Sequence, residues 1–461
     1  MAAKTSISNG MLFTDRRDFY IQPQVVNELY QDITPFTTLM GSLGSVSIQD
    51  PVFKQFEYRN SWLDQYVKTT AAATNIYGAD PFALKTSIVL TCGSATPGLG
   101  RDSSGIILWN DREIASPTFN NSAVGLLLQY TDGAGKVINL KVVSVSGAAL
   151  TCDVVGVVGY AATGANATVD AIAASSRIDV LGSAFEEGGS APDASSDDIS
   201  VIFGRTQIMK TSIEVTGTLY HMALRGYSDE LARLRSEKMK EHKIQKEKTF
   251  LLGMDPKRGA VGSAGYGTAM SEESGIRYTS GVIPSILRFG KTYEATDNSG
   301  GKKANVFNVV GSGGGATTFT EFVGITENLF ATLPSSSESK VFFCGAGVLS
   351  FFSNPDLGLY TNGGFQINDT IKSQYGYNIR KLVTPHGEIN LVHAPVLRGA
   401  WRNYGVMIDT DYVKQYTFRP TTYQANIKTD NAYDGVKDQI MSDEGIGLSM
   451  LEKHAVIKVT P

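Results

Sequence analysis

The first sixty residues combine short apolar clusters with residues that interrupt regular structure. Val25, Val26, Leu29 and Tyr30 are spaced so that they share one face of a helix, which predicts a short helix there. Prolines and glycines follow at short intervals up to residue 51, the Thr34-Pro35-Phe36 turn among them. The segment therefore predicts an extended arm and not part of a core.

Residues 85–205 show the pattern of β-structure. Runs such as 137–145 and 150–158 are rich in β-branched residues and are separated by turns of Gly, Ser and Asp. Residues 182–198 are acidic, small and rich in turn formers, and they lack apolar anchors. The pattern predicts a β-rich unit with one segment that becomes ordered only against a neighbour.

A strand-like run at residues 207–216 is followed by one long helix. Residues 228–252 contain no Gly or Pro and many strong helix formers, and Ser228 and Gly253 are candidate caps. At about 1.5 Å per residue this helix is roughly 37 Å long. Its large apolar residues predict one narrow packing stripe: Leu231, Leu234, Ile244 and Leu251.

From residue 305 onward, strand-like and helix-like runs alternate. Residues 305–310 and 340–344 have strand character, whereas residues 318–332 and 348–354 have helix character, which predicts a compact mixed body. After residue 412 the chain returns to β character, with a last strand at 450–459. A chain of 461 residues is long enough for two or three cores, and the fold class predicted is α+β.

Composition and charge narrow the function classes. With 41 basic and 45 acidic residues the net charge is -4, which argues against wrapping of nucleic acid by the chain as a whole. The three cysteines, Cys92, Cys152 and Cys344, are too far apart for a zinc knuckle and fit a reducing compartment. Neither a secretory leader nor a membrane-spanning run is found, which predicts synthesis as a soluble cytoplasmic product.

Two motifs resemble sites of chemistry, and both are weak. The run Gly311-Ser312-Gly313-Gly314-Gly315-Ala316 follows a strand and precedes a helix, as in nucleotide-binding loops, but no Lys-Ser or ribose-binding acid follows it, which favours a flexible turn. His386, Glu388 and His393 lack the spacing of zinc hydrolases. Cys344 lies in an apolar run and is typical of an inert thiol. We expect no enzyme activity, catalytic residue, cofactor or metal.

The charges of the 228–252 helix have two readings. Its lysines and arginines are numerous enough to face DNA, but Glu237, Glu241 and Glu247 are interspersed with them. Mixed charge weakens any field that attracts phosphate. The pattern favours a helix packed along neighbouring protein over a helix that tracks DNA.

The order of these parts resembles the tailed-bacteriophage major capsid protein family, which has a Hong-Kong-97-like fold. Asp32-Ile33-Thr34-Pro35-Phe36, followed by the run 53–62, is similar to the arm of one branch with a Thr-Pro-Phe signature. Gly204-Arg205-Thr206-Gln207-Ile208, then Val215-Thr216-Gly217-Thr218 and a helix that ends Leu251-Leu252-Gly253, is similar to the same branch. No residues match the cross-linking Lys and Asn of that family.

The resemblance implies five parts. They are an N-terminal arm (1–65), an E-loop with a β-rich insertion (66–206), a P-domain (207–300) with the spine helix 228–252, an A-domain (301–410), and a β return into the P-domain (411–461). The insertion is longer than a bare hairpin, and its length fits a small barrel or a sandwich.

The implied function is a structural subunit of a virion, the icosahedral head shell that encloses double-stranded DNA. Pentamers and hexamers of this chain are the expected partners, with portal, scaffolding and decoration proteins, DNA bound on the inner face without sequence specificity, and no membrane. Other virion proteins, such as a tail tube or decoration protein, and a nucleotide-binding enzyme are the alternatives. Because interface anchors are often aromatic or arginine, the inter-subunit contacts expected are Tyr30, Phe36, Trp62, Arg225, Glu230 and Arg233.

Overall fold

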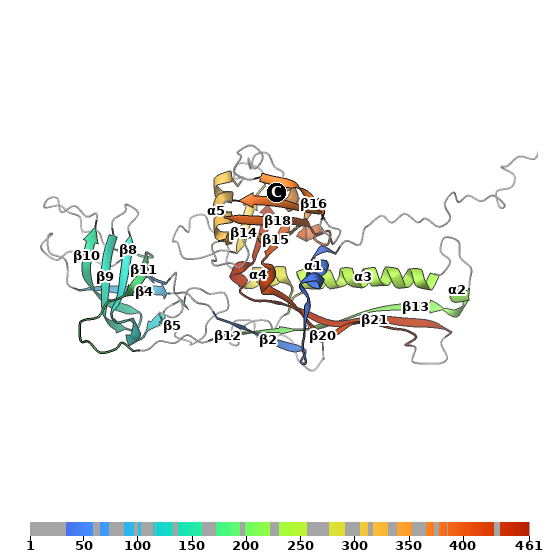
Figure 1. Cartoon of the computed structure of the whole chain (residues 1–461), viewed down its shortest axis with the longest axis horizontal. Coiled ribbons are helices and arrows are strands. Elements are labelled where there is room, and N and C mark those ends of the chain that lie inside the picture. The colour runs from blue at the N-terminus through green and yellow to red at the C-terminus, as the bar shows by residue number, and fades with distance from the viewer. Residues whose placement is uncertain are drawn as a thin grey trace, which may run out of the picture.

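The structure is a computed structural model, and it describes most of the chain between residues 34 and 460. The described ranges are 34–58, 65–72, 87–95, 100–102, 114–115, 117–131, 137–158, 172–193, 199–221, 230–255, 276–290, 305–311, 317–330, 339–352, 366–372, 378–384, 386–427 and 434–460. Figure 1 shows an elongated molecule, with a long helix over a narrow sheet, a compact mixed body above them and a separate β-unit at one end. The α+β class predicted from the sequence is confirmed.

The long helix and the sheet below it form what we call the platform. The sheet has the order β1 (Ser45–Ser47), β20 (Val413–Gln424), β21 (Gly435–Leu448), β13 (Gln207–Thr216), and only the β1–β20 pair is parallel. Helix α3 (Glu230–Leu252) runs along β13 and β21, and a short helix α2 (Gly217–His221) follows β13. Of the predicted stripe, Leu231 and Leu251 are buried and Leu234 and Ile244 half-buried. The candidate cap Ser228 lies outside the described residues.

Within the predicted arm, residues 35–43 form a helix that is anchored in the core. Helix α1 (Pro35–Leu43) has proline at its first position, where the missing N–H costs nothing and the fixed φ suits a helix. Phe36 and Met40 are almost fully buried, and Phe36 meets Phe343 edge to face with 5.3 Å between ring centroids. The short helix predicted around residues 25–30 lies outside the described residues.

After α1 and β1 the chain enters an isolated two-stranded ribbon, which we call the hairpin. Strand β2 (Val52–Glu57) pairs antiparallel with β12 (Ser200–Arg205) from Ser200 opposite Glu57 to Arg205 opposite Val52. The burial of β2 alternates strictly, with Phe53, Gln55 and Glu57 buried. The hairpin therefore has one face packed on the platform and one face directed away from it.

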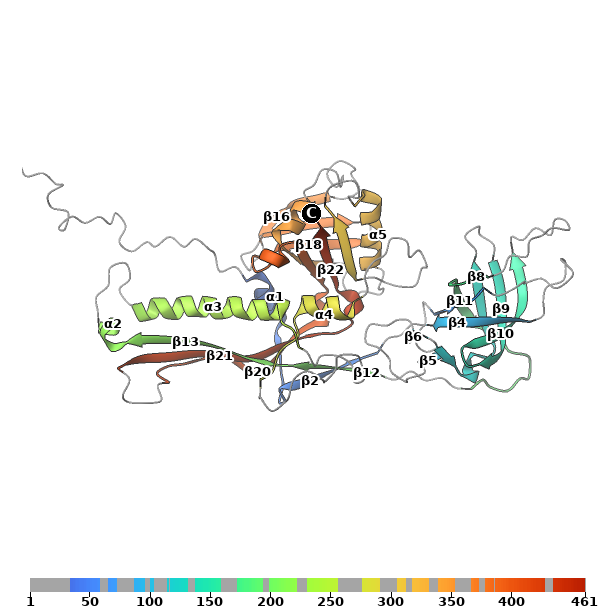
Figure 2. The ribbon, with the colours of Figure 1, turned by 180° about the vertical axis from the view of Figure 1, so that it is seen from behind.

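Beyond the hairpin lies a closed β-barrel, one of the two forms that the length of the insertion predicted. Its strands, in order around the ring, are β3 (Tyr66–Thr69), β4 (Ile88–Ala95), β10 (Ala149–Val158), β9 (Val137–Ser146), β8 (Leu126–Thr131) and β11 (Arg177–Ser183), and β11 pairs again with β3. Short strands β6 (Ile114–Ala115), β5 (Gly100–Asp102) and β7 (Pro117–Phe119) and the turn η3 (Asn121–Ala123) lie beside the ring. Leu90, Ile138, Leu140 and Ile178 fill the interior and are fully buried. Figure 2 shows the barrel standing apart from the remaining domains.

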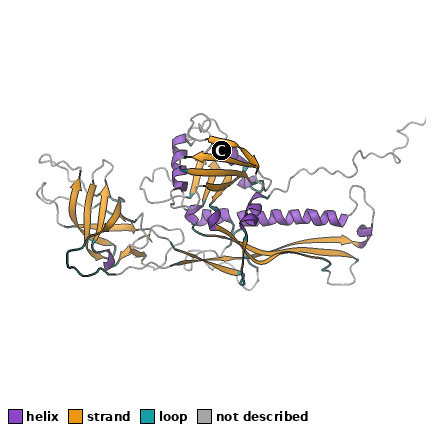
Figure 3. Cartoon of the chain, viewed as in Figure 1, coloured by secondary structure: helices purple, strands orange, loops and turns teal. Residues whose placement is uncertain are grey.

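The compact mixed body is a seven-stranded sheet with helices around it. Its order is β14 (Val306–Val310), β22 (Ala455–Thr460), β19 (Tyr404–Ile408), β15 (Ser339–Cys344), β18 (Gly387–His393), β17 (Asn378–Thr384), β16 (Gln366–Lys372). The α-helices are α4 (Val282–Phe289), α5 (Phe319–Phe330) and α6 (Ala346–Phe352). The short 3-10 helices are η6 (Gly399–Trp401), η7 (Thr410–Tyr412) and η8 (Leu451–Lys453). Figure 3 shows helices beside the strands of this body, whereas the barrel unit consists almost wholly of strands.

One apolar cluster joins the platform to the mixed body. Phe36 of α1, Phe250 of α3, Ile283 of α4, Phe343 of β15 and Ile446 of β21 belong to the same buried core. Because these residues come from five elements, the platform and the mixed body share their packing. Among the described residues, no helix is both long and apolar enough to cross a bilayer.

Candidate functional site

The most unusual chemistry of the described chain is a row of buried carboxylates on β21. Asp438 and Asp443 are 0% exposed and Glu444 is 3% exposed. A buried carboxylate is costly unless cations or hydrogen-bond donors surround it. Each of the three has such partners from other elements, so β21 is a strand to which several parts of the chain are attached.

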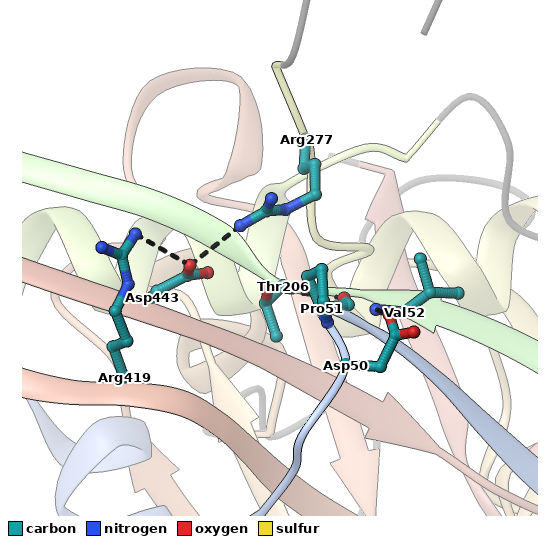
Figure 4. Close-up of polar contacts among 7 residues, drawn as sticks. All are labelled: Asp50, Pro51, Val52, Thr206, Arg277, Arg419 and Asp443. Atoms are coloured by element: carbon teal, nitrogen blue, oxygen red, sulfur yellow. Dashed lines mark hydrogen bonds and ion pairs between the residues drawn. The ribbon is translucent and has the colours of Figure 1, made fainter.

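Asp443 joins two arginines from opposite directions. Its Oδ2 lies 2.8 Å from the guanidinium of Arg277, in the segment before α4, and 3.2 Å from that of Arg419 on β20. The three side chains are drawn in Figure 4, where both dashed contacts converge on the same carboxylate. This bridge ties β20, β21 and the 276–280 segment together.

The entry to the hairpin lies beside this bridge, as Figure 4 also shows. The amide of Thr206, between β12 and β13, donates to the carbonyl of Pro51 at 2.9 Å. The amide of Val52 donates to Oδ1 of Asp50 at 2.8 Å, which fixes the turn into β2. Both strands of the hairpin are therefore held at the point where they leave the platform.

The other two carboxylates attach α3 and the end of β20. Glu444 pairs with Lys246 of α3 and accepts a hydrogen bond from Gln415 at 2.8 Å. Asp438 lies 2.8 Å from Arg235 of α3 and also accepts from Tyr423. Burial acts to raise the pKa of Asp438, but hydrogen bonds from Tyr423, the Asn426 amide and Arg235 outweigh it and hold that pKa below its ordinary value.

The hairpin crosses β21 where β21 carries glycine. A Cβ at Gly445 would lie 2.8 Å from the carbonyl oxygen of Arg205, and one at Gly447 would lie 2.5 Å from the Tyr416 ring. The Phe53 ring stacks on that Tyr416 ring with 4.0 Å between centroids. The close approach of the hairpin strands to β21 leaves no room for a side chain at these two positions, which explains the Gly-Ile-Gly sequence.

A groove opens between the end of α3 and α4. Its volume is about 440 Å³, and its lining residues are Met254, Asp255, Ser280, Pro284, Ser285, Leu287 and Arg288. Asp255 is held by two hydrogen bonds from the Arg205 guanidinium, at 2.7 and 3.2 Å, so the groove is attached to the base of the hairpin. Among the lining residues, Met254 is 67% exposed.

The face of the hairpin that points away from the platform combines large apolar side chains with the exposed Lys54. Phe56 is 70% exposed, and Val52 and Tyr58 are also exposed. Large apolar side chains gathered on a projecting ribbon are typical of a surface that another protein covers. Two apolar surfaces, the outer hairpin face and the groove, thus occur on one chain.

The six predicted contact residues do not converge on this site. Tyr30, Trp62 and Arg225 lie outside the described residues, as does the side chain of Glu230 at the start of α3. Arg233 pairs with Glu237 one turn along its own helix. Phe36 is fully buried inside its own chain, so its side chain packs α1 and leaves no surface for a neighbouring subunit.

Sequence reasoning also missed residues of this site. Alternation in β2 was the available signal for Phe56, because Phe53, Gln55 and Glu57 occupy the opposite face. No local signal marks Asp443 or Arg277, since their contact joins positions 166 residues apart.

The weak chemical motifs gain no support from their surroundings. Glu388 forms an ion pair with Lys381 at 2.7 Å, and no cluster of metal-ligating side chains occurs in the described ranges. All three cysteines are buried, and burial raises the pKa of Cys92 and Cys152 to about 12. Gly311 borders a cavity of about 640 Å³ that also contains Arg402, whereas residues 312–316 of the glycine run lie outside the described chain.

Comparison with known proteins gives one match over nearly the whole sequence. A family model described as SU10 major capsid protein matches residues 8–461. One similar solved structure is the bacteriophage PhiM1 mature capsid, with 10% identity, 61% of this chain and 79% of that chain covered, and a TM-score of 0.37. The capsid of a native GTA particle is similar with 9% identity, 61% of this chain and 82% of that chain covered, and a TM-score of 0.37. The holo-SrpI encapsulin complex of Synechococcus elongatus is similar with 9% identity, 58% of this chain and 77% of that chain covered, and a TM-score of 0.35. The curated proteins give no match.

Proposed function

The chain belongs to the SU10 major capsid protein family, and we propose that its copies tile the head shell through the outer face of the hairpin, which would cover an apolar surface of a neighbouring copy. The chain is a structural capsid protein and a virion component, and the predicted resemblance to phage major capsid proteins is confirmed. Assignment to a Thr-Pro-Phe branch stays a prediction.

The exposed Phe56 is the observation that supports this surface. A two-stranded ribbon is marginally stable in water, and this one exposes apolar side chains on one face. The apolar groove beside the base of the hairpin is a receptor of matching character on the same chain. Because both surfaces occur on the same chain, each subunit can insert its hairpin face into one neighbour and bind the hairpin face of another in its groove.

We further propose the finer features of this role. The five predicted parts, 1–65, 66–206, 207–300, 301–410 and 411–461, would serve as arm, E-loop, P-domain, A-domain and β return. The role is structural and not catalytic, the chain is made in the cytoplasm of a bacterial host, and portal, scaffolding and decoration proteins are further partners. DNA would lie against the inner face without sequence readout, in keeping with the net charge of -4.

The test is Phe56→Ser in the full chain. Burial of a phenylalanine contributes about 2 kcal/mol, so we expect the concentration needed for assembly to rise roughly thirty-fold. Light scattering and electron microscopy measure assembly, and circular dichroism checks that the subunit is folded. The matched control is Val155→Ser on the barrel, at a side chain that is 58% exposed. Closed shells of Phe56→Ser at the wild-type concentration would contradict the proposed surface.

A further inference from the structure

Helix α1 begins without a cap of its own. Thr34 precedes it and makes no side-chain capping bond, and its first turn contains no acidic residue. Pro35 has no N–H, so the amides of Phe36 and Thr37 are the first donors without partners inside the helix. A buried helix start needs acceptors for such amides from elsewhere.

The acceptor comes from α3. The amide of Thr37 donates to Oε2 of Glu247 at 3.2 Å, across 210 residues of sequence. Glu247 is 0% exposed. Its other oxygen, Oε1, is buried and has no hydrogen-bond partner within the described residues. A side chain of the long helix therefore caps the helix that leads into β1 and the hairpin.

No cation balances this carboxylate in the described part of the chain. Helix α1 carries no charged residue. The charged residues of the elements packed around α3 have other partners or are exposed: Lys246 with Glu444, Arg235 with Asp438, Arg277 and Arg419 with Asp443, Arg288 with the Asp255 carbonyl, and the exposed Lys210, Glu214, Lys243, Lys248 and Lys414. The buried imidazole of His242 on α3 shares hydrogen bonds with Thr211 and Ser442, and burial lowers its pKa.

This setting favours a proton on Glu247 while α1 is docked. Burial raises the pKa of Glu247 to about 7, and hydrogen bonds from Thr37 and Phe36 offset part of that rise. Once α1 leaves, water reaches the carboxyl and its pKa returns toward the ordinary value of about 4.3. Between those two values the docked state binds more protons, so docking weakens as the pH rises and reaches its weakest level above pH 7.

We propose that Glu247 is a proton-controlled latch, which holds α1 on α3 when it is neutral and loosens α1 when it is ionised. Because α1 leads directly into β1 and the hairpin, the latch sets how firmly the N-terminal part of each subunit is attached to its own platform. The contact lies within one chain, so the inference stands or falls independently of the proposed surface for assembly.

Hydrogen exchange of the α1 amides in the full-length subunit tests the latch. With correction for intrinsic exchange, we expect the opening constant of α1 to rise more than about ten-fold between pH 5.5 and pH 8. Glu247→Gln, which is neutral at every pH, should remove this dependence. The matched control Glu241→Gln, on the same helix and paired with Lys238, should keep it.

Two results would overturn the latch: a wild-type opening constant that does not change with pH, or a pH dependence that persists in Glu247→Gln. Circular dichroism and exchange in the barrel check that the variants fold. If Glu247→Gln does not fold, Glu247→Asp is the second test. It keeps an ionisable group but draws it back from the Thr37 amide, so its transition should remain and move along the pH axis. An Asp variant without a transition, or with the wild-type midpoint, would equally refute the proposal.

Discussion

Asp443→Asn is the sharpest test of how the hairpin base is held. Asparagine has nearly the same volume as aspartate, so the substitution removes the charge and leaves the packing in place. The wild-type carboxylate is 0% exposed and is contacted by Arg277 at 2.8 Å and by Arg419 at 3.2 Å. What is lost is the ionic part of two contacts that join three segments of the chain.

The size of the effect follows from the exposure of the two arginines. The Arg277 side chain is 24% exposed, and a charge-assisted hydrogen bond of this kind contributes about 1.5–3 kcal/mol. The Arg419 side chain is 44% exposed and its contact is longer, so solvent reduces its share to about 0.2–1 kcal/mol. Together they give about 3 kcal/mol, or roughly 150-fold in a local opening constant.

Local exchange is the suitable assay, because a chain with a separate barrel does not unfold in one step. We expect faster exchange of the amides in β20, in β21 and in residues 276–280, with the barrel unchanged. The control is Glu214→Gln, which removes an ion pair with Lys437 at 3.4 Å. Both side chains of this pair are largely exposed, so the substitution should lower the local stability by less than about 0.5 kcal/mol. A change below that level in Asp443→Asn, or one equally large in the barrel, would refute the reasoning.

Two further predictions concern the glycine crossing and a buried lysine. Gly447→Ala places a Cβ 2.6 Å from Gln55 Nε2 and should destabilise the hairpin crossing by about 1–3 kcal/mol, measured by exchange in β2, whereas Gly156→Ala, with open space around it, should not. Burial lowers the pKa of Lys340 to about 8, so the unfolded chain binds more protons between pH 8 and about 10.5 and stability should rise with pH there. The melting temperature of the mixed body should show this rise, and Lys340→Met should lose it; an equal rise in both proteins would exclude Lys340 as its source.

Elements whose signal is local were predicted well. The strand expected at 207–216 is β13, and the helix expected at 228–252 is α3, because a stretch without Gly or Pro specifies its own conformation. The β-rich character of the insertion followed from β-branched alternation, whereas its length left a barrel and a sandwich as equal alternatives. The last strand was predicted at residues 450–459, but β22 begins only at Ala455, because Met450 has a positive φ of 48° that does not fit a strand.

Features that depend on tertiary contacts were not predicted. The sequence predicts a turn at Pro35, whereas the structure starts α1 there, because the partners that bury Phe36 lie on β15 and in the platform core. No local signal marks the carboxylates of β21 as buried, since only the folded chain brings Arg277, Arg419 and Lys246 to them. Local sequence gives the period of burial but not the identity of a distant counter-ion.

The distribution of charge and apolar surface separates what a subunit can do alone from what needs a neighbour. On β21, the carboxylates Asp438, Asp443 and Glu444 are buried and paired within the chain, so these contacts hold the platform together without another copy. In the hairpin the opposite holds, because Phe56 is exposed while the base is fixed by Arg205 and Thr206. A rigid base with an uncovered apolar face loses little conformational entropy on docking. That combination favours association of many copies through modest contacts, each of which the platform has already oriented.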